Sequence, residues 1–150
     1  MDRPLKLSPS LEDYLEAIFH IQSRASVVRA SEIASRLEVR GASVTGALQS
    51  LARKGLVNYA PYQEVTLTEN GCAAAHEVVK RHQALHKFFV EVLDVEEEAA
   101  QIAACRMEHS LPRPIMDRIS GFVDFLAESG DQGGKLVENF KASLVPSNNG

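Results

Sequence analysis

The sequence predicts a mainly α-helical chain with one β-hairpin before its middle. Apolar residues recur at helical spacing before residue 55 and again after residue 70, which favours helices in both stretches. Between them, "LVNYAPYQEVTLT" shows alternating apolar residues and a break at Ala60-Pro61, which favours a hairpin with Pro61 in its turn. The expected order is three helices, a hairpin and an all-helical second half.

Three helices are expected before the hairpin. Ser8 suits the N-cap of the first helix, with Pro9 at its first position. "RASEIASRLEV" predicts a short second helix capped by Ser31, and "SVTGALQSLARKG" predicts a third that begins at Ser43 and ends at Gly55. Helix, helix, turn, helix and hairpin is the order of a winged helix-turn-helix.

The third helix of such a fold enters the major groove of DNA, so the first half is expected to bind DNA. Hydroxyl and guanidinium groups near its first turn suit contacts to phosphates and base edges. Two alternatives remain open: the arginines are solvated surface charges, or the domain is a protein–protein interaction module. The candidate DNA-binding residues are Arg29, Arg36, Arg40, Ser43 and Thr45.

The second half is expected to contain three helices. The first runs from about residue 70 to 93, the second is capped by Asp94 and runs to about 110, and the third begins near Pro112. "ESGDQGG" ends the third helix, and no clear pattern follows it. The predicted domains are a winged helix (1–72), a helical domain (73–130) and a partly ordered C-terminal tail (131–150).

The charge of the chain is unevenly distributed. The formal net charge is −4; residues 1–72 hold 8 basic and 8 acidic residues, whereas residues 73–150 hold 8 and 12. A neutral half can still present a local basic face to DNA. No apolar run approaches the roughly 18 residues of a membrane span, and the N-terminus lacks a secretory signal. We therefore expect a cytoplasmic protein without a membrane partner, whose two cysteines are thiols.

The segment "ACRMEHS" brings together three groups that bind metals. Cys105, Glu108 and His109 are spaced i, i+3 and i+4, which places them on one face of a helix. A thiolate, a carboxylate and an imidazole suit a borderline divalent ion better than Mg²⁺ or Ca²⁺. One helix supplies only three ligands, so a metal site here requires further ligands from other segments.

Two other helices offer such ligands. His82 lies on an apolar stripe with His86 one turn further on; the alternative is an inert core histidine. Asp13 and Glu16 share a face of the first helix. The alternative for these acids is a favourable interaction with the helix macrodipole alone.

Four separated motifs carry a family resemblance. "LSPSLEDYLEAIFHI", "LEVRGASVTGALQSLARKGLV", "VTLTENGCAAAHEVVKRHQAL" and "CRMEHSL" follow one another over about residues 7–127 and resemble the diphtheria toxin repressor family. That family includes iron-dependent repressors and shorter manganese transport regulators. The resemblance implies an N-terminal winged helix domain followed by a helical metal-binding and dimerisation domain, without the SH3-like third domain of many iron-type members.

The resemblance also implies a function. A member of this family is expected to be a transcriptional repressor and not an enzyme. It would bind palindromic operator DNA as a homodimer, control genes of metal homeostasis and take no small organic substrate. A bound metal would tie the first helix to the second half of the chain and fix the spacing of the two reading helices in the dimer.

The resemblance assigns the metal ligands residue by residue. Asp13 matches the manganese type of site and Cys105 the iron type, so Fe²⁺ is expected slightly ahead of Mn²⁺, with Co²⁺, Ni²⁺ and Zn²⁺ as further ions that bind in vitro. An ancillary iron-type site would include His86 and Gln101, but both depart from the family pattern. The principal site falls on Asp13, Glu16, His82, Cys105, Glu108 and His109.

The dimer surface is expected on the helices between residues 95 and 127; the alternative is that their apolar stripe only closes the core of the monomer. Two other functions remain open. One is a winged-helix sensor of thiol oxidation or of a small ligand, with Cys105 as the switch; the other is a metal-dependent hydrolase, for which no acid–base group is evident. The candidate dimer residues are Ile115, Ile119, Phe122 and Val123.

Overall fold

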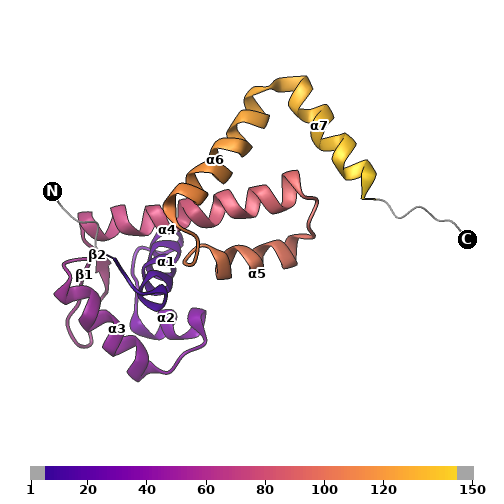
Figure 1. Ribbon diagram of the computed structural model, residues 1–150. Helices are drawn as coiled ribbons and strands as arrows, with labels where there is room; N and C mark the ends of the chain where they lie inside the picture. The colour runs from indigo at the N-terminus through magenta and orange to yellow at the C-terminus, as the bar shows by residue number, and fades with distance from the viewer. Residues whose placement is uncertain (1–5, 145–150) are drawn as a thin grey trace, which may run out of the picture. The chain divides into compact units, whose positions relative to one another are not determined.

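The structure is a computed structural model that describes residues 6–144 and divides into two compact units (Figure 1). The first unit ends at Val79 and the second begins at Lys80. The boundary therefore falls within one helix, α4 (Glu69–Lys87).

The first unit has the element order predicted for a winged helix-turn-helix. Its helix α1 packs against α2 and α3, and its two short strands pair antiparallel, with Val57 opposite Leu67. An isolated bridge between Val28 and Val65 ties the hairpin to the segment before α2. The elements are α1 (Pro9–Arg24), α2 (Ala30–Leu37), α3 (Gly41–Arg53), β1 (Val57–Asn58), β2 (Thr66–Leu67) and the first part of α4.

Apolar residues from all of these elements form the core of this unit. The i, i+3, i+4 stripes predicted from the sequence supply its fully buried side chains, so the helices pack through the faces that the pattern indicated. The core includes Leu15 and Ile18 of α1, Ile33 of α2, and Leu48 and Leu51 of α3.

The helix ends agree with the sequence in part. The Ser8 hydroxyl accepts from the Leu11 N–H at 3.3 Å, and Gly55 adopts a φ of +73° after α3, both as predicted. The predicted cap Ser31 and the predicted start at Ser43 are wrong, because α2 begins at Ala30 and α3 at Gly41. Arg29 precedes α2, where the Glu32 carboxylate accepts its N–H, and Arg40 precedes α3.

The second unit consists of helices. The end of α4 continues into one turn of π-helix, η1, after which Asp94 takes a left-handed φ of 58°. The prediction that Asp94 caps α5 is wrong. The Glu96 carboxylate caps this helix instead and accepts from the Glu98 and Ala99 N–H groups at 3.1 and 3.2 Å. The elements are η1 (Phe88–Val92), α5 (Glu97–Met107), α6 (Arg113–Glu128) and α7 (Gly130–Ser143).

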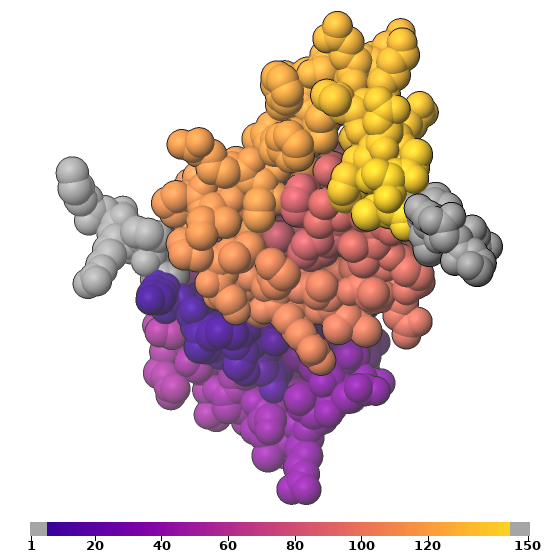
Figure 2. Space-filling view, turned by 45° about the vertical axis from the view of Figure 1, so that its right-hand side comes forward, coloured from indigo at the N-terminus to yellow at the C-terminus, as the bar shows by residue number. Residues whose placement is uncertain are grey.

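Helix α7 was not predicted from the sequence. The segment "ESGDQGG" does end α6, but α7 begins at once and packs against α6 (Figure 2). Gly133 allows this approach, because a Cβ atom there would collide with the Leu126 carbonyl group of α6. The last six residues of the predicted partly ordered tail, 145–150, lie outside the described part of the chain.

The prediction of a mainly α-helical fold with an N-terminal winged helix-turn-helix is confirmed. Among the helices described between residues 6 and 144, none combines the length and the apolarity of a membrane span.

Candidate functional site

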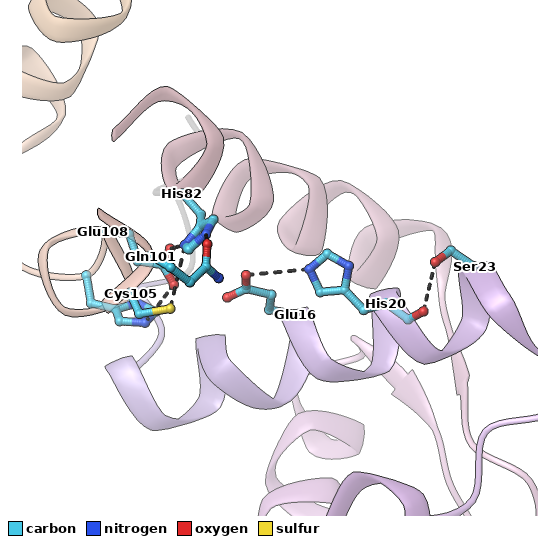
Figure 3. A network of polar contacts seen from close by, with 8 residues as sticks. Glu16, His20, Ser23, His82, Gln101, Cys105 and Glu108 are labelled. Carbon is cyan, nitrogen blue, oxygen red and sulfur yellow. Dashed lines mark hydrogen bonds and ion pairs between the residues drawn. The ribbon is translucent and has the colours of Figure 1, made fainter. Parts of the chain in front are cut away.

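Four potential metal ligands converge in the second unit, one on α4, one on α5 and two just after the end of α5. Figure 3 labels three of them, His82, Cys105 and Glu108. The Nδ1 atom of His82 lies 2.8 Å from the Oε2 atom of Glu108 and 3.8 Å from the Sγ atom of Cys105. The other carboxylate oxygen of Glu108, Oε1, lies 3.1 Å from the Nε2 atom of His109. The Glu108 carboxylate thus faces two imidazoles, with the thiol beside one of them.

The local backbone explains why these side chains meet. Helix α5 ends at Met107, yet the Glu108 N–H still donates to the Ala104 carbonyl at 3.0 Å. The helical path therefore continues through Glu108 and keeps it on the same side as Cys105. Around them, Leu85 of α4 and Ala104 of α5 are fully buried in one apolar cluster, which holds the two helices together.

The cluster fits a divalent metal. Two ligand atoms that are each about 2.1 Å from one ion, at right angles around it, lie about 3 Å apart. The separation of 2.8 Å between His82 Nδ1 and Glu108 Oε2 is close to that value. Two imidazoles, a carboxylate and a thiol form the mixed donor set that borderline divalent metals prefer.

A second pair of contacts lies on the outer side of His82. Its Nε2 atom is 3.1 Å from Gln101 Oε1, and one turn along both helices His86 Nε2 is 2.7 Å from Glu97 Oε1. The rings of His82 and His86 are stacked, with centroids 6.3 Å apart. Glu97 was not predicted as a site residue, although Glu97 and Gln101 share the one-turn spacing of the two histidines.

The remaining two predicted ligands, Asp13 and Glu16, lie on α1 of the first unit. Glu16 Oε1 is 3.6 Å from His20 Nε2, and the Ser23 hydroxyl donates to the His20 carbonyl at 2.8 Å (Figure 3). Of the acids on α1, Glu12 is the one in the first turn. The macrodipole acts mainly within that turn, so it does not explain why an acidic residue stands at position 16.

A polar groove marks the candidate DNA-binding surface of the first unit. It has a volume of about 1020 Å³ and is lined by residues at the start of α2, on α3 and in the hairpin. Arg29 and Thr45, both predicted, line it. The Thr45 hydroxyl donates to the Gly41 carbonyl at 3.2 Å and retains its acceptor lone pairs. Arg36, Arg40 and Ser43 are exposed and lie outside the lining.

The groove also contains residues that were not predicted from the sequence. Gln49 is exposed on α3, one turn beyond Thr45, and Asn58 lies on β1. Tyr62 is fully exposed in the hairpin turn, with a φ of 62°. Side-chain amides are hydrogen-bonding partners of adenine, so the one-turn spacing of Thr45 and Gln49 was a usable signal.

The predicted dimer residues are all on α6 and differ in exposure. Ile115 is 47% exposed and Phe122 is 46% exposed, whereas Val123 is buried. The exposed side chains line an apolar hollow of about 480 Å³. Its lining residues are Phe88, Pro114, Ile115, Arg118, Ile119 and Phe122.

Comparison with known proteins relates both units to one family. Residues 6–65 match the family model described as iron dependent repressor, N-terminal DNA binding domain. Residues 68–135 match the model described as iron dependent repressor, metal binding and dimerisation domain. An uncharacterized HTH-type transcriptional regulator of Methanocaldococcus jannaschii is 36% identical over 119 residues, which cover 79% of this chain and 95% of that protein. The chain belongs to the iron-dependent repressor family.

Other members of the iron-dependent repressor family are similar over nearly the whole chain. The HTH-type transcriptional regulator MntR of Lysinibacillus sphaericus is 32% identical over 141 residues, covering 94% of this chain and 98% of that protein. MntR of Bacillus subtilis is 32% identical over 121 residues, covering 81% of this chain and 84% of that protein.

Solved structures share the fold. A manganese-dependent transcriptional repressor in complex with manganese superposes with a TM-score of 0.70 at 30% identity, covering 77% of this chain and 53% of that one. The manganese regulator SloR superposes with a TM-score of 0.68 at 22% identity, covering 79% of this chain and 55% of that one. This chain thus spans about half the length of these solved relatives.

These findings confirm the predicted family. They also confirm, at the level of the family, the expectation of a divalent-metal cofactor, because the second half of the chain matches a metal-binding and dimerisation domain. One solved relative is named as a manganese-dependent transcriptional repressor, whereas the two matching family models are named as iron dependent repressors.

Proposed function

We propose that this protein is a divalent-metal-activated transcriptional repressor. It binds palindromic operator DNA as a homodimer in the cytoplasm, controls genes of metal homeostasis and catalyses no reaction. The observation that carries this proposal is the convergence of His82, Cys105, Glu108 and His109 in the part of the chain that matches a metal-binding domain. Support for the DNA-binding role comes from the match of the first unit to a DNA-binding domain and from its exposed polar groove.

The metal site takes six ligands in this proposal: the four of the second unit, together with Asp13 and Glu16 of α1. The family resemblance supports the inclusion of the two acids, as does their position beyond the first turn of α1. A divalent ion, when bound, is coordinated by carboxylate, imidazole and thiolate groups at the same time. Because Cys105 and His109 bind without their protons, metal affinity rises with pH.

The ligands also bear on the choice of metal. Thiolates favour Fe²⁺ and later ions, whereas carboxylates accept Mn²⁺ readily. Nitrogen, oxygen and sulfur ligands generally bind Fe²⁺ more tightly than Mn²⁺. We therefore infer activation by both ions, with Fe²⁺ bound more tightly through Cys105. The similarity to a solved manganese-dependent repressor supports Mn²⁺ as the second activator.

The metal acts on DNA binding through α1. This helix carries Asp13 and Glu16, and it packs against α2 and α3, which form the helix-turn-helix. A metal held by ligands of both units restricts how α1 and the reading helix move relative to the dimerisation domain. The metal favours the DNA-binding arrangement only to the extent that it binds that arrangement more tightly.

DNA binding uses the groove and its surroundings. Arg29 and Thr45 line the groove, and Arg36, Arg40 and Ser43 extend this polar surface along α2 and the start of α3. In a two-fold dimer, the reading helices enter successive major grooves about 34 Å apart. The second copy of the chain packs against the exposed apolar face of α6, through Ile115, Ile119 and Phe122, while Val123 contributes to packing within its own chain.

One observation favours a second candidate function. Cys105 is an exposed thiol close to an imidazole, as expected of a redox-sensing cysteine. If thiol oxidation is the signal, mild oxidation abolishes DNA binding and chelation under reducing conditions has no effect. Metal activation predicts that chelation alone abolishes DNA binding.

The direct experiment is an anaerobic DNA-binding titration. A binding duplex is first selected from a randomised pool with Mn²⁺ present, and its affinity is then measured with Fe²⁺, Mn²⁺, Co²⁺, Ni²⁺, Zn²⁺ or chelator. The proposal predicts tight, salt-sensitive binding with Fe²⁺ and Mn²⁺ and weak binding with chelator. Equal affinity with metal and with chelator would overturn it.

A further inference from the structure

We propose that Gln101 is a positioning residue that holds the ring of His82 so that its Nδ1 atom faces the metal. This inference rests on the proposed metal-binding function, and it concerns a residue outside the six ligands. Its basis is the contact between Gln101 Oε1 and His82 Nε2, which are 3.1 Å apart. The opposite ring nitrogen, Nδ1, faces the carboxylate of Glu108.

The hydrogen-bonding chemistry of the ring links the two contacts. The Gln101 carboxamide oxygen is an acceptor, so the Nε2 atom of His82 donates a proton to it. When Nε2 carries the proton, Nδ1 can offer its lone pair to a metal. Nδ1 and Glu108 Oε2 lie 2.8 Å apart, a hydrogen-bonding distance, so a proton lies between them and a bound cation would displace it.

A glutamine suits this outer position for an electrostatic reason. Metal-binding histidines commonly donate their second N–H to a carboxylate, a carbonyl or water, which fixes the ring and its tautomer. The Gln101 amide supplies such an oxygen without adding a charge or a strong ligand of its own. His82 therefore binds through one nitrogen, with the other engaged by the protein.

The neighbouring contact provides a comparison within the same pair of helices. His86 and Glu97 lie one turn from His82 and Gln101, respectively, and their side chains meet at 2.7 Å. Their contact joins the same two helices. It does not involve the Nε2 atom of His82, so weakening it leaves the tautomer of His82 unchanged.

The test compares three variants of the full chain. Gln101→Leu keeps a similar volume and removes the acceptor, Gln101→Glu keeps an acceptor oxygen, and Glu97→Gln alters the neighbouring contact. Mn²⁺ affinity is measured anaerobically by the EPR signal of the free ion. The ring nitrogens of His82 are assigned by ¹⁵N NMR in the Zn²⁺-loaded protein, and circular dichroism checks that each variant is folded.

We expect Gln101→Leu to weaken Mn²⁺ binding by about 10–100-fold. Gln101→Glu should keep an affinity close to that of the wild type. Glu97→Gln should change the Mn²⁺ affinity by less than about threefold. In the Zn²⁺-loaded wild type, His82 carries its proton on Nε2 and binds through Nδ1. In Gln101→Leu this tautomer is no longer uniquely populated.

Three results would overturn the inference. The first is a Gln101→Leu variant that binds Mn²⁺ as tightly as the wild type. The second is metal bound to Nε2 of His82. The third is a fall from two bound ions to one in Gln101→Leu, since that would make Gln101 a ligand of an ancillary site. If the wild type binds Mn²⁺ and Zn²⁺ but one of these three results is found, only the role of Gln101 is overturned. If the wild type binds neither metal, the proposed metal-binding function is overturned as well.

Discussion

The Nδ1 atom of His82 lies 2.8 Å from the Oε2 atom of Glu108, although 26 positions separate the two residues in the sequence. This contact joins α4 to the end of α5 and places a buried carboxylate beside an imidazole. The second oxygen of the same carboxylate faces His109. Glu108 is therefore the central ligand of the proposed metal site.

Replacing Glu108 by glutamine should remove most of the metal affinity. The amide keeps the shape of the side chain, but it lacks the negative charge and offers only one ligand oxygen. We expect Mn²⁺ affinity to fall by more than the roughly 10–100-fold typical of an outer-shell change. Isothermal titration under anaerobic conditions measures this. Glu98→Gln, an exposed change on the same helix, is the control and should bind like the wild type.

Cys105 should influence which metal activates the protein. Replacing it by glutamate exchanges a thiolate for a carboxylate, so the preference should shift from Fe²⁺ toward Mn²⁺, on the order of tenfold. The measurement is the ratio of Fe²⁺ to Mn²⁺ concentrations that give half-maximal DNA binding. Cys72→Ala, which changes the other cysteine, should keep the wild-type ratio. An unchanged ratio in Cys105→Glu would count against a role for the sulfur in metal choice.

Arg29 should contribute to DNA binding through phosphate contact. Arg29→Ala should weaken binding to all duplexes similarly and lower the slope of log affinity against log salt by about 1. Thr45→Ala should weaken binding with little change in that slope, because threonine carries no charge. Fluorescence anisotropy at several salt concentrations distinguishes the two effects. Arg113→Ala, on α6 of the other unit, is the charge-matched control and should leave the slope unchanged.

Two adjacent glycines of α7 should respond in opposite ways to alanine. A Cβ atom at Gly133 meets the Leu126 carbonyl, so Gly133→Ala should lower the free energy of unfolding by about 1–3 kcal/mol. Nothing lies near a Cβ atom at Gly134, so Gly134→Ala should stabilise the helix by roughly 0.5–1 kcal/mol. Thermal unfolding of both variants measures the difference. Equal melting temperatures would contradict the close packing of α7 on α6.

The sequence predicted those features that depend on local spacing. Cys105, Glu108 and His109 could be grouped because i, i+3 and i+4 share one helical face, and the structure keeps them together even though α5 ends at Met107. The contacts of Gln101 and Glu97 with the two histidines could not be predicted in this way. They depend on how α4 aligns with α5, which no single-helix pattern specifies.

The glycine-rich segment after α6 is a second place where local sequence patterns did not predict the structure. Glycines near residue 130 favoured the end of a helix, and α6 does end there. Local propensity did not reveal that Gly133 is required for close packing of a further helix, because that role depends on Leu126 of the neighbouring element. Tertiary packing thus overrode the low helix propensity of glycine.

In the proposed function, metal binding and DNA binding are coupled. The most direct measurement is the Mn²⁺ affinity of the full chain with and without a saturating selected duplex. Because coupling is reciprocal, DNA should tighten Mn²⁺ binding by the same factor by which Mn²⁺ tightens DNA binding, about 5–150-fold. Identical Mn²⁺ affinities with and without the duplex would show that the two binding events are not coupled.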